Sequence, residues 1–272
     1  MNGNGYQPEL KDALRSLRLP VFAAEHSATA ARAAHEGWTF DRFLLELCQL
    51  ELVQREQHRR QKLLASSRLP REKTLPQFER QRLKRSADQQ FAALVEGDFL
   101  ERSENVLVFG PPGSGKTHLL CALGHELIGQ GKSVLFSSCV LLVQRLLLAK
   151  NELWLERELK RLDKFEALII DDLGYVQQSR EEMEVLFTLL AHRYERRSVL
   201  LTSNLVFSEW ERIFKDPLTT LTTAAAIDRL VHHSVILELN QPSYRMEAAK
   251  RQKSNSDGGH GKAAMAADLI EN

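Results

Sequence analysis

The sequence predicts an α/β fold, with a five-stranded parallel sheet between helices and a small all-helical domain before it. Two observations carry this prediction. Short apolar runs, typical of strands buried on both faces, alternate with helical stretches in the second part of the chain. In the first part, apolar residues recur at helical spacing and strand-like runs are missing. Alternation of strand and helix favours parallel pairing of the strands.

The N-terminal helical domain is expected over residues 1–69. Apolar residues recur at helical spacing from Leu10 to Leu17 and again from Phe40 to Leu50. Prolines end this pattern, the first of them at Pro70, because proline lacks a backbone donor and restricts the residue before it. We therefore expect a linker over residues 70–90, rich in basic side chains.

The α/β domain is expected over residues 91–250. Its predicted strands are the apolar runs Val106–Phe109, Val134–Phe136, Ala167–Ile170, Val199–Leu201 and Val235–Leu237. The predicted helices between them run from Thr117 to about Gln130, from Val140 to Leu162 and from Arg180 to Arg193. The remaining residues, 251–272, are rich in Ser, Asn, Gly and Ala and are expected to be disordered.

Composition narrows the class of protein further. The formal net charge of the 272 residues is only +1, so attraction to nucleic acid requires local clusters of Lys and Arg. The three cysteines, Cys48, Cys121 and Cys139, are scattered and lack metal-ligand spacing, which favours buried thiols in a reducing compartment. The sequence shows neither a signal-peptide pattern nor an apolar stretch of bilayer length, so we expect a cytoplasmic protein without membrane contact.

A phosphate-binding loop follows the first predicted strand and opens the next helix. It reads Gly110-Pro111-Pro112-Gly113-Ser114-Gly115-Lys116-Thr117, with His118 directly after it. Glycines let backbone N–H groups converge on phosphate oxygens, and the helix N-terminus adds a partial positive charge. Lys116 is expected to reach the β- and γ-phosphates of ATP and Thr117 to offer its hydroxyl to Mg²⁺.

Two carboxylates end the predicted strand Ala167–Ile170, where ligands bind in open α/β sheets. Asp171 is expected to hold Mg²⁺, through a water molecule, and Asp172 to orient and deprotonate the attacking water. Aspartate is also a strong turn former, so a role for Asp172 in capping the turn at Leu173-Gly174 is an open alternative.

Asn204 ends another predicted strand. It would lie beside the two carboxylates if its strand lies between the strand before the loop and the acidic strand, and it would then hold the γ-phosphate or the water. An ordinary turn at the strand end is the alternative for Asn204. A strand inserted in this way suits ring-forming ATPases better than nucleotide kinases.

Arginines are candidates for stabilising the charge that develops during phosphoryl transfer. Arg229 is the candidate for a finger supplied to a neighbouring subunit, and Arg245 for a contact with the phosphates of its own subunit. Spacing alone leaves solvated or ion-paired arginines as the alternative. Arg193, Arg196 and Arg197 end a predicted helix, where cations complement the helix dipole.

Basic residues cluster between Gln54 and Arg85, with few acids among them. Contact with the phosphates of duplex DNA is one interpretation, and a solvated helix face or linker is the other. The cluster lacks the aromatic residues on which single strands stack, which favours duplex. The candidate DNA contacts are Arg55, Arg59, Arg60, Lys62, Arg68, Arg71 and Lys73.

These motifs, in this order, resemble the IstB-type transposition helper ATPases, which are related to DnaC-type helicase loaders within the AAA+ class. The similarity covers about Leu10 to Arg245. The shared core motifs are Gly110–Leu119, Ile170–Gly174, Thr202–Asn204, Ala226–Leu230 and Ser243–Arg245. Segments that resemble the transposition helpers in particular are Leu17–Leu19, Phe43–Glu51 with Arg55, Leu69–Leu75, Arg193–Arg197 and Phe207–Trp210.

The resemblance implies an AAA+ fold without the usual C-terminal helical lid. It implies ATP-dependent homo-oligomers on duplex DNA, presentation of target DNA to a partner transposase, and stimulation of that transposase. It gives Arg229 the finger role in trans and Arg245 the role of second sensor. Asp172 stands where the wider class has Glu, which implies slow intrinsic hydrolysis. A DNA-binding ATPase of this kind is further expected to be stimulated by DNA.

Two other functions are compatible with the same residues. One is loading of a replicative helicase, since the ATPase motifs are shared with helicase loaders. The other is a nucleotide-gated adaptor that bends DNA with little hydrolysis.

Overall fold

The computed structural model describes residues 6–174, 179–205, 228, 230–240 and 243–244. Contacts divide the chain into two compact units, Met1–Ala65 and Ser66–Asn272. The predicted disordered tail, and the predicted absence of a C-terminal lid, concern residues outside the described ones.

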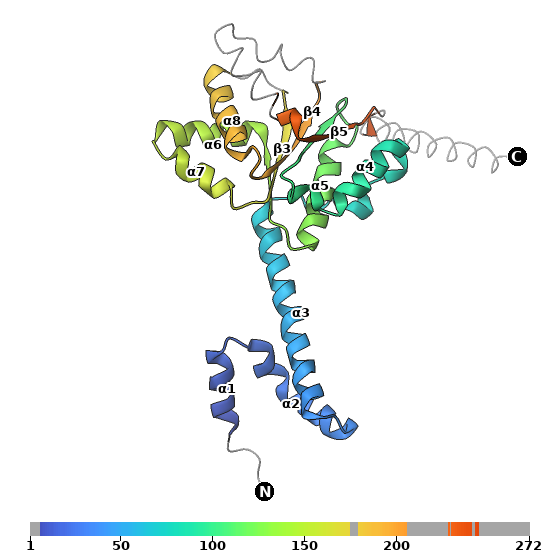
Figure 1. The fold of residues 1–272 in the computed structure, drawn as a ribbon, viewed down its shortest axis with the longest axis vertical. Coiled ribbons are helices and arrows are strands. Elements are labelled where there is room, and N and C mark those ends of the chain that lie inside the picture. Colours follow the sequence, from blue (N-terminus) through green and yellow to red (C-terminus); the bar gives the residue numbers. More distant parts are fainter. Residues whose placement is uncertain (1–5, 175–178, 206–227, 229, 241–242, 245–272) are drawn as a thin grey trace, which may run out of the picture. The chain divides into compact units, whose positions relative to one another are not determined.

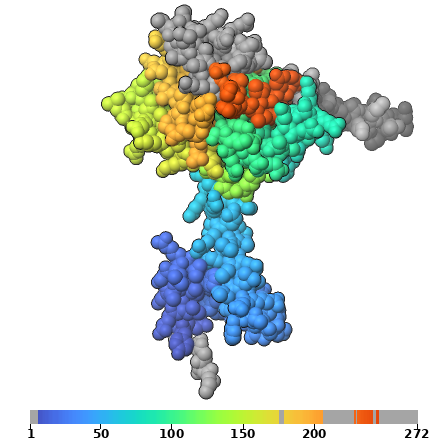
Figure 2. All heavy atoms as spheres, in the orientation of Figure 1, coloured from blue at the N-terminus to red at the C-terminus, as the bar shows by residue number. Residues whose placement is uncertain are grey.

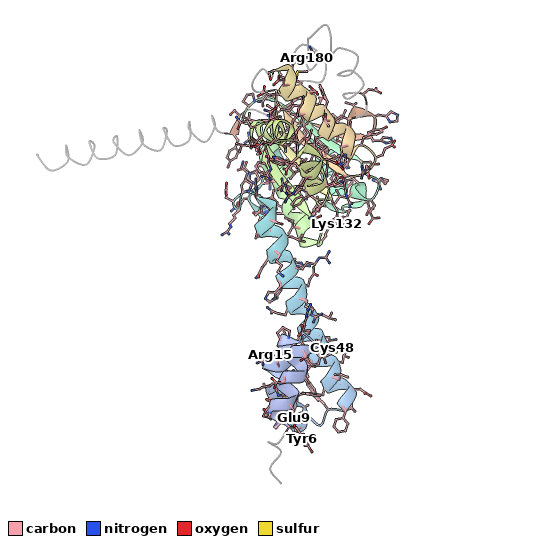
Figure 3. The ribbon with its side chains drawn as sticks, turned by 90° about the vertical axis from the view of Figure 1, so that its left-hand side faces the viewer. Tyr6, Glu9, Arg15, Cys48, Lys132 and Arg180 are labelled. Carbon is pink, nitrogen blue, oxygen red and sulfur yellow. The ribbon has the colours of Figure 1, made fainter. Side chains whose placement is uncertain are left out.

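The first unit is helical, as predicted. Its helices are α1 (Gln7–Ser16), α2 (Pro20–Glu36) and α3 (Phe40–Ser67), of which α3 continues past the boundary between the units. A small apolar core forms from Leu14, Phe22 and Leu47, one residue from each helix. Cys48, labelled on α3 in Figure 3, is partly buried against this core.

The second unit contains a five-stranded parallel sheet. Its strands are β1 (Asn105–Phe109), β2 (Val134–Ser138), β3 (Ala167–Leu173), β4 (Ser198–Ser203) and β5 (Ser234–Glu238). The spatial order is β2-β3-β4-β1-β5, and every neighbouring pair is parallel. Strand β4 thus lies between β1 and β3, which meets the condition that the sequence set for Asn204.

Helices cover both faces of this sheet (Figure 1). They are α4 (Arg85–Val95), α5 (Lys116–Gly129), α6 (Cys139–Asn151), α7 (Leu155–Leu162) and α8 (Arg180–Arg193). Short 3-10 helices occur at η1 (Leu75–Gln77), η2 (Arg80–Arg82) and η3 (Asp98–Leu100). Figure 2 shows α6 and α7 next to α8 on one side of this unit and α4 on the other.

One predicted helix is wrong. The stretch from Val140 to Leu162 was expected to form a single helix, but α6 ends at Asn151 and α7 starts at Leu155. Leu153 between them has a φ of 61°, a left-handed conformation that interrupts a right-handed helix. The apolar spacing continues across the break, and this is why the sequence pattern does not reveal it.

The core of the second unit fixes the strand ends that face the site. Alternate strand residues such as Leu107, Leu168 and Leu201 are fully buried and pack with residues of α6 and α8. Ile169, on the other face of β3, lies close to Gly124 of α5. Because these strands are parallel, the carboxyl ends of β1, β3 and β4 lie at one edge of the sheet.

Candidate functional site

The loop between β1 and α5 has the backbone that phosphate binding requires. Gly113 and Gly115 have φ angles of 81° and 97°, which residues other than glycine rarely adopt. A Cβ at Gly113 would also overlap the side chain of Ser243. Gly115 is the N-cap of α5 and makes no side-chain capping bond, so the first turn of α5 offers its amides to a ligand.

Lys116 is held at the centre of this loop and is only 4% exposed. Its Nζ donates hydrogen bonds to the carbonyl oxygens of Gly110 and Pro111, at 2.8 and 3.0 Å. A third bond, of 2.6 Å, goes to Oδ1 of Asn204 at the end of β4. Lys116 of the phosphate loop and Asn204, at the end of the inserted strand, are therefore in direct contact.

One hydroxyl, that of Thr202, bonds the carboxylate of Asp171 and the backbone of Asp172 at the end of β3. Thr202 Oγ1 donates to Asp171 Oδ1 at 2.7 Å and accepts from the backbone N–H of Asp172 at 2.8 Å. Asp171 is buried, whereas the side chain of Asp172 is exposed. Asp172 has a φ of 61°, and the register of β3 against β4 shifts between Ile170 and Leu173. This bulge turns consecutive carboxylates in different directions.

A pocket of about 290 Å³ joins these groups. One part of its lining comes from Pro112 to His118, and Asp172 and Asn204 also line it. Asp171 is not among the lining residues. Within the described residues, Ser114 Oγ is buried without a hydrogen-bond partner, as expected of a loop that awaits an anionic ligand.

The rest of the pocket lining was missed by the sequence analysis. It comes from the segment before α4 and from a residue after β5, namely Lys73, Gln77, Phe78, Glu79, Arg82 and Tyr244. Lys73 was a candidate for DNA contact, and Tyr244 falls in the motif Ser243–Arg245, but neither was predicted to line the pocket. The segment has no hydrophobic periodicity, and a single aromatic residue in a basic stretch gives no signal for a nucleotide pocket.

The candidate finger and second sensor, Arg229 and Arg245, lie outside the described residues. Tyr244, next to Arg245 in the sequence, is described. Its backbone N–H donates to the carbonyl of Gly113 at 2.9 Å, and its ring lies 5.3 Å from the guanidinium of Arg82. The chain after β5 therefore returns to the phosphate loop.

The basic residues predicted to contact DNA fall on both units. On α3, Arg55 is paired with Glu51 and donates to the carbonyl of Arg18, and Arg60 is paired with Glu56. The members in the second unit are Arg68, Arg71 and Lys73. Arg68 and Arg71 are exposed to solvent, as are Arg59 and Lys62 on α3.

Two ionisable groups outside the pocket, Cys121 and Arg193, are buried in the protein interior. Burial raises the pKa of the Cys121 thiol to about 12, and Cys139 is also buried, whereas Cys48, which was predicted to be buried as well, is only partly so. Arg193 is completely buried and donates to carbonyls of the α7–β3 connection and of Ser198. Burial lowers the pKa of Arg193 to about 10.

The residues present fit a magnesium nucleotide better than a protein-only metal site. Among the described residues, no group of three His, Cys, Asp or Glu side chains is arranged to hold a metal. Hydroxyl and carboxylate oxygens at Thr117 and Asp171 are ligands that Mg²⁺ prefers, with phosphate oxygens completing its shell.

Within the described part of the chain, no helix is both long and apolar enough to cross a membrane.

A phosphate loop at the carboxyl edge of this parallel sheet, with a sensor strand between the loop strand and the acidic strand, defines an ATP-binding protein of the AAA+ class. The chain belongs to the family of IstB-like ATP binding proteins, whose model matches residues 12–255.

Relatives support the same family. An insertion sequence ATP-binding protein of Sinorhizobium fredii is 44% identical over 88% of this chain and 80% of its own length. The ATP-binding protein of insertion sequence IS21 from Pseudomonas aeruginosa is 37% identical over 89% of this chain and 91% of its own. Both relatives are named as ATP-binding proteins of insertion sequences.

Solved structures agree on the fold. DnaI covers 64% of this chain and 96% of its own, at 21% identity and a TM-score of 0.54. AMPPCP-bound DnaA from Aquifex aeolicus covers 70% of this chain and 57% of its own, at 18% identity and a TM-score of 0.50. At these identities the likeness shows the AAA+ fold alone.

Proposed function

We propose that this chain is a DNA-stimulated ATPase that oligomerises on duplex DNA, presents target DNA and stimulates a partner transposase. The observation that supports it most is the convergence of Lys116, Asn204 and Asp172 on one pocket, at the edge where parallel sheets bind ligands. The names of the relatives supply the transposition context.

In this proposal each residue has a stated part in hydrolysis. Lys116 exchanges the loop carbonyls for β- and γ-phosphate oxygens, while Asn204 stays close enough to hold the γ-phosphate or the water. Asp172 accepts a proton from the attacking water, whose oxygen bonds to the γ-phosphorus as the bond to the β–γ bridging oxygen breaks. The products are ADP and phosphate.

Mg²⁺, when bound with the nucleotide, neutralises the charge on the phosphate oxygens. Thr117 and Asp171 would hold it, with Asp171 kept in place by the hydroxyl of Thr202. Arg229 from a neighbouring subunit and Arg245 from the same subunit would complete the site. ATP bound between subunits would then stabilise the oligomer, by mass action, in the way that any ligand of the assembled state does.

Exposed basic residues support the DNA part of the proposal. Arg59, Lys62, Arg68 and Arg71 are solvent-exposed in a chain of almost zero net charge. Contacts from such residues to phosphates do not depend on sequence and weaken as salt increases.

ATP turnover with and without duplex DNA tests this function. We expect DNA to stimulate wild-type turnover and Lys116→Ala to abolish nucleotide binding. Asp172→Asn should retain binding and lose turnover by about 10²-fold or more. Lys132→Ala is the matched control, because Lys132 pairs with Glu101 and Glu166 away from the pocket. Full DNA-dependent function in Asp172→Asn would favour the adaptor that needs little hydrolysis.

Affinity capture with the full chain separates the remaining alternative. A transposase encoded in the same insertion sequence should be retained when ATP and duplex DNA are present. Retention of a hexameric replicative helicase in its place would favour a helicase loader.

A further inference from the structure

A second hollow of the second unit lies at α6 and α7, apart from the nucleotide pocket. Its volume is about 850 Å³, and it shares no lining residue with that pocket. Figure 1 shows these two helices on the side of the unit opposite α4. Cations dominate the lining, which includes Arg145, Arg157, Lys160, Arg161 and Lys164.

Four of these cations form one row along α7. They stand at positions i, i+3, i+4 and i+7, which share one face of a helix. The opposite face carries Leu159 and Leu162, which are buried in the core of the unit. The outward row, called the α7 stripe below, consists of Arg157, Lys160, Arg161 and Lys164.

The acids interleaved with the stripe compensate little of its charge at the surface. Glu158 is only 3% exposed and accepts from Arg145 and Arg161, so its carboxylate lies beneath the stripe. Glu156 is exposed and pairs with Lys160, a type of surface pair that contributes little free energy. Because acids and bases alternate along this helix, the sequence shows no basic run here. The positive face appears only once Glu158 is seen to be buried.

The length of the α7 stripe suits the backbone of a DNA strand. Seven residues of α-helix span about 10 Å. One strand of duplex DNA carries a phosphate about every 3.4 Å along the helix axis, so the stripe runs beside about three phosphates. Contacts of this kind position a duplex without reading its sequence.

An apolar side chain projects at the turn between α6 and α7, next to Trp154 of the hollow. Leu153 is 94% exposed and has a φ of 61°, a conformation that is strained for leucine. The backbone N–H of Trp154 donates to the carbonyl of Ala149 at 2.9 Å, so the backbone of the turn holds Leu153 outward. Proteins that bend DNA insert such apolar side chains between base steps, beside cations that hold the phosphates.

We propose that the α7 stripe binds the phosphate backbone of duplex DNA and that Leu153 enters the adjacent groove as a wedge that bends the duplex. This inference rests on the proposed function, since it takes duplex DNA as the partner. It adds a DNA surface on the unit that binds nucleotide, separate from the basic residues between Gln54 and Arg85.

Fluorescence anisotropy of a labelled duplex, with the full chain and over a series of salt concentrations, tests the backbone contact. Arg157→Ala/Lys164→Ala should weaken binding by about tenfold or more. It should also reduce the slope of log affinity against log salt by about 2, one for each lost phosphate contact. Lys11→Ala/Arg15→Ala is the matched control, because it removes the same charge from exposed positions on α1. The control should keep the wild-type slope.

Energy transfer between dyes at the two ends of the duplex tests the wedge. At saturating protein, Leu153→Ala should lower the transfer efficiency towards that of free duplex, because the bend is lost. Leu17→Ala is the control, since Leu17 is 67% exposed on the first unit.

Acetylation of lysines in the wild-type chain tests the surface without a substitution. Duplex DNA should slow modification of Lys160 and Lys164 by several fold, as measured by mass spectrometry. Modification of Lys11, which is also exposed, should not change.

A wild-type salt slope in Arg157→Ala/Lys164→Ala, an equal loss in the α1 control, or unprotected Lys164 would each overturn the stripe. Unchanged energy transfer in Leu153→Ala would overturn the wedge. Binding of a fluorescent ATP analogue should be the same in all variants, which shows that they fold. A wild-type chain that binds no duplex would overturn the proposed function itself, so the two failures are distinguishable.

Discussion

At the scale of single residues, Arg193 contributes more to the stability of the fold than its position at a helix end indicates. Its guanidinium has no exposed surface and donates to the carbonyls of Leu162, Phe165 and Ser198 at 3.0 Å each. The residue thus joins the C-termini of α7 and α8 to the start of β4. These carbonyls would have no water to replace the lost donor.

Arg193→Met should therefore destabilise the protein by about 3–5 kcal/mol, because it leaves several buried acceptors unpaired. Urea denaturation at neutral pH measures the loss. Arg196→Met is the control, since the Arg196 side chain is 62% exposed, and a change of about 0.5 kcal/mol or less is expected there. Equal midpoints for the two variants would remove the structural role of Arg193.

Thr202 is a second residue whose role appears only in the structure. One hydroxyl positions both aspartates at the end of β3. Thr202→Val keeps the shape of the side chain but loses both bonds, so ATP turnover should fall by about tenfold or more while nucleotide binding changes less. Thr188→Val, on the exposed side of α8, is the matched control. Wild-type turnover in Thr202→Val would show that Asp171 and Asp172 need no such support.

At the scale of elements, Glu158 holds α6 and α7 together across the break at Leu153. Arg145 of α6 and Arg161 of α7 both donate to its carboxylate, which is 3% exposed. Burial alone would raise the pKa of Glu158, but the hydrogen bonds from Arg161 and Arg145 outweigh it and lower the pKa below its usual 4.5.

The sign of this shift predicts an acid-dependent loss of stability. A carboxyl group with a lowered pKa in the folded state stabilises the fold above about pH 4.5, and the contribution is lost as pH falls through the folded pKa. Glu158→Gln should thus destabilise the protein at pH 7, and the difference from wild type should shrink towards pH 4 and below. Urea denaturation at several pH values measures it, with Glu156→Gln, at 80% exposure, as the control. A difference independent of pH would contradict this assignment.

How much of the fold and the site the sequence could predict depends on whether the residues concerned are adjacent in the chain or distant from one another. The phosphate loop is one contiguous segment, so the residues Gly110–Thr117 alone were enough to predict it. Asn204 and Asp171 are far from it in sequence, but strand ends in a parallel sheet meet at one edge, which made their proximity predictable. The break at Leu153 and the burial of Arg193 depend on packing that no local pattern records. The position of Phe78 in the pocket also depends on packing, since its neighbours Gly115 and His118 come from another part of the chain.

At the scale of the whole molecule, Lys73 belongs to two sites that the sequence analysis treated as separate. Arg71 and Lys73 were candidates for DNA contact, and Lys73 also lines the nucleotide pocket. If Lys73 serves both sites, ATP and duplex DNA should change each other's affinity by the same factor, as linkage requires. Titrations of a fluorescent ATP analogue with and without duplex DNA measure the effect of DNA on nucleotide affinity. Titrations of duplex DNA with and without ATP measure the effect of nucleotide on DNA affinity. No change in either affinity would separate nucleotide binding from DNA binding.

The central claim is that ATP binding at Lys116 controls assembly on duplex DNA. Sedimentation velocity of the full chain, with and without ATP and duplex DNA, tests it most directly. We predict large nucleoprotein species only when wild-type protein, ATP and DNA are all present, and their loss in Lys116→Ala. Species of the same size in Lys116→Ala, or in wild-type protein without ATP, would contradict the claim.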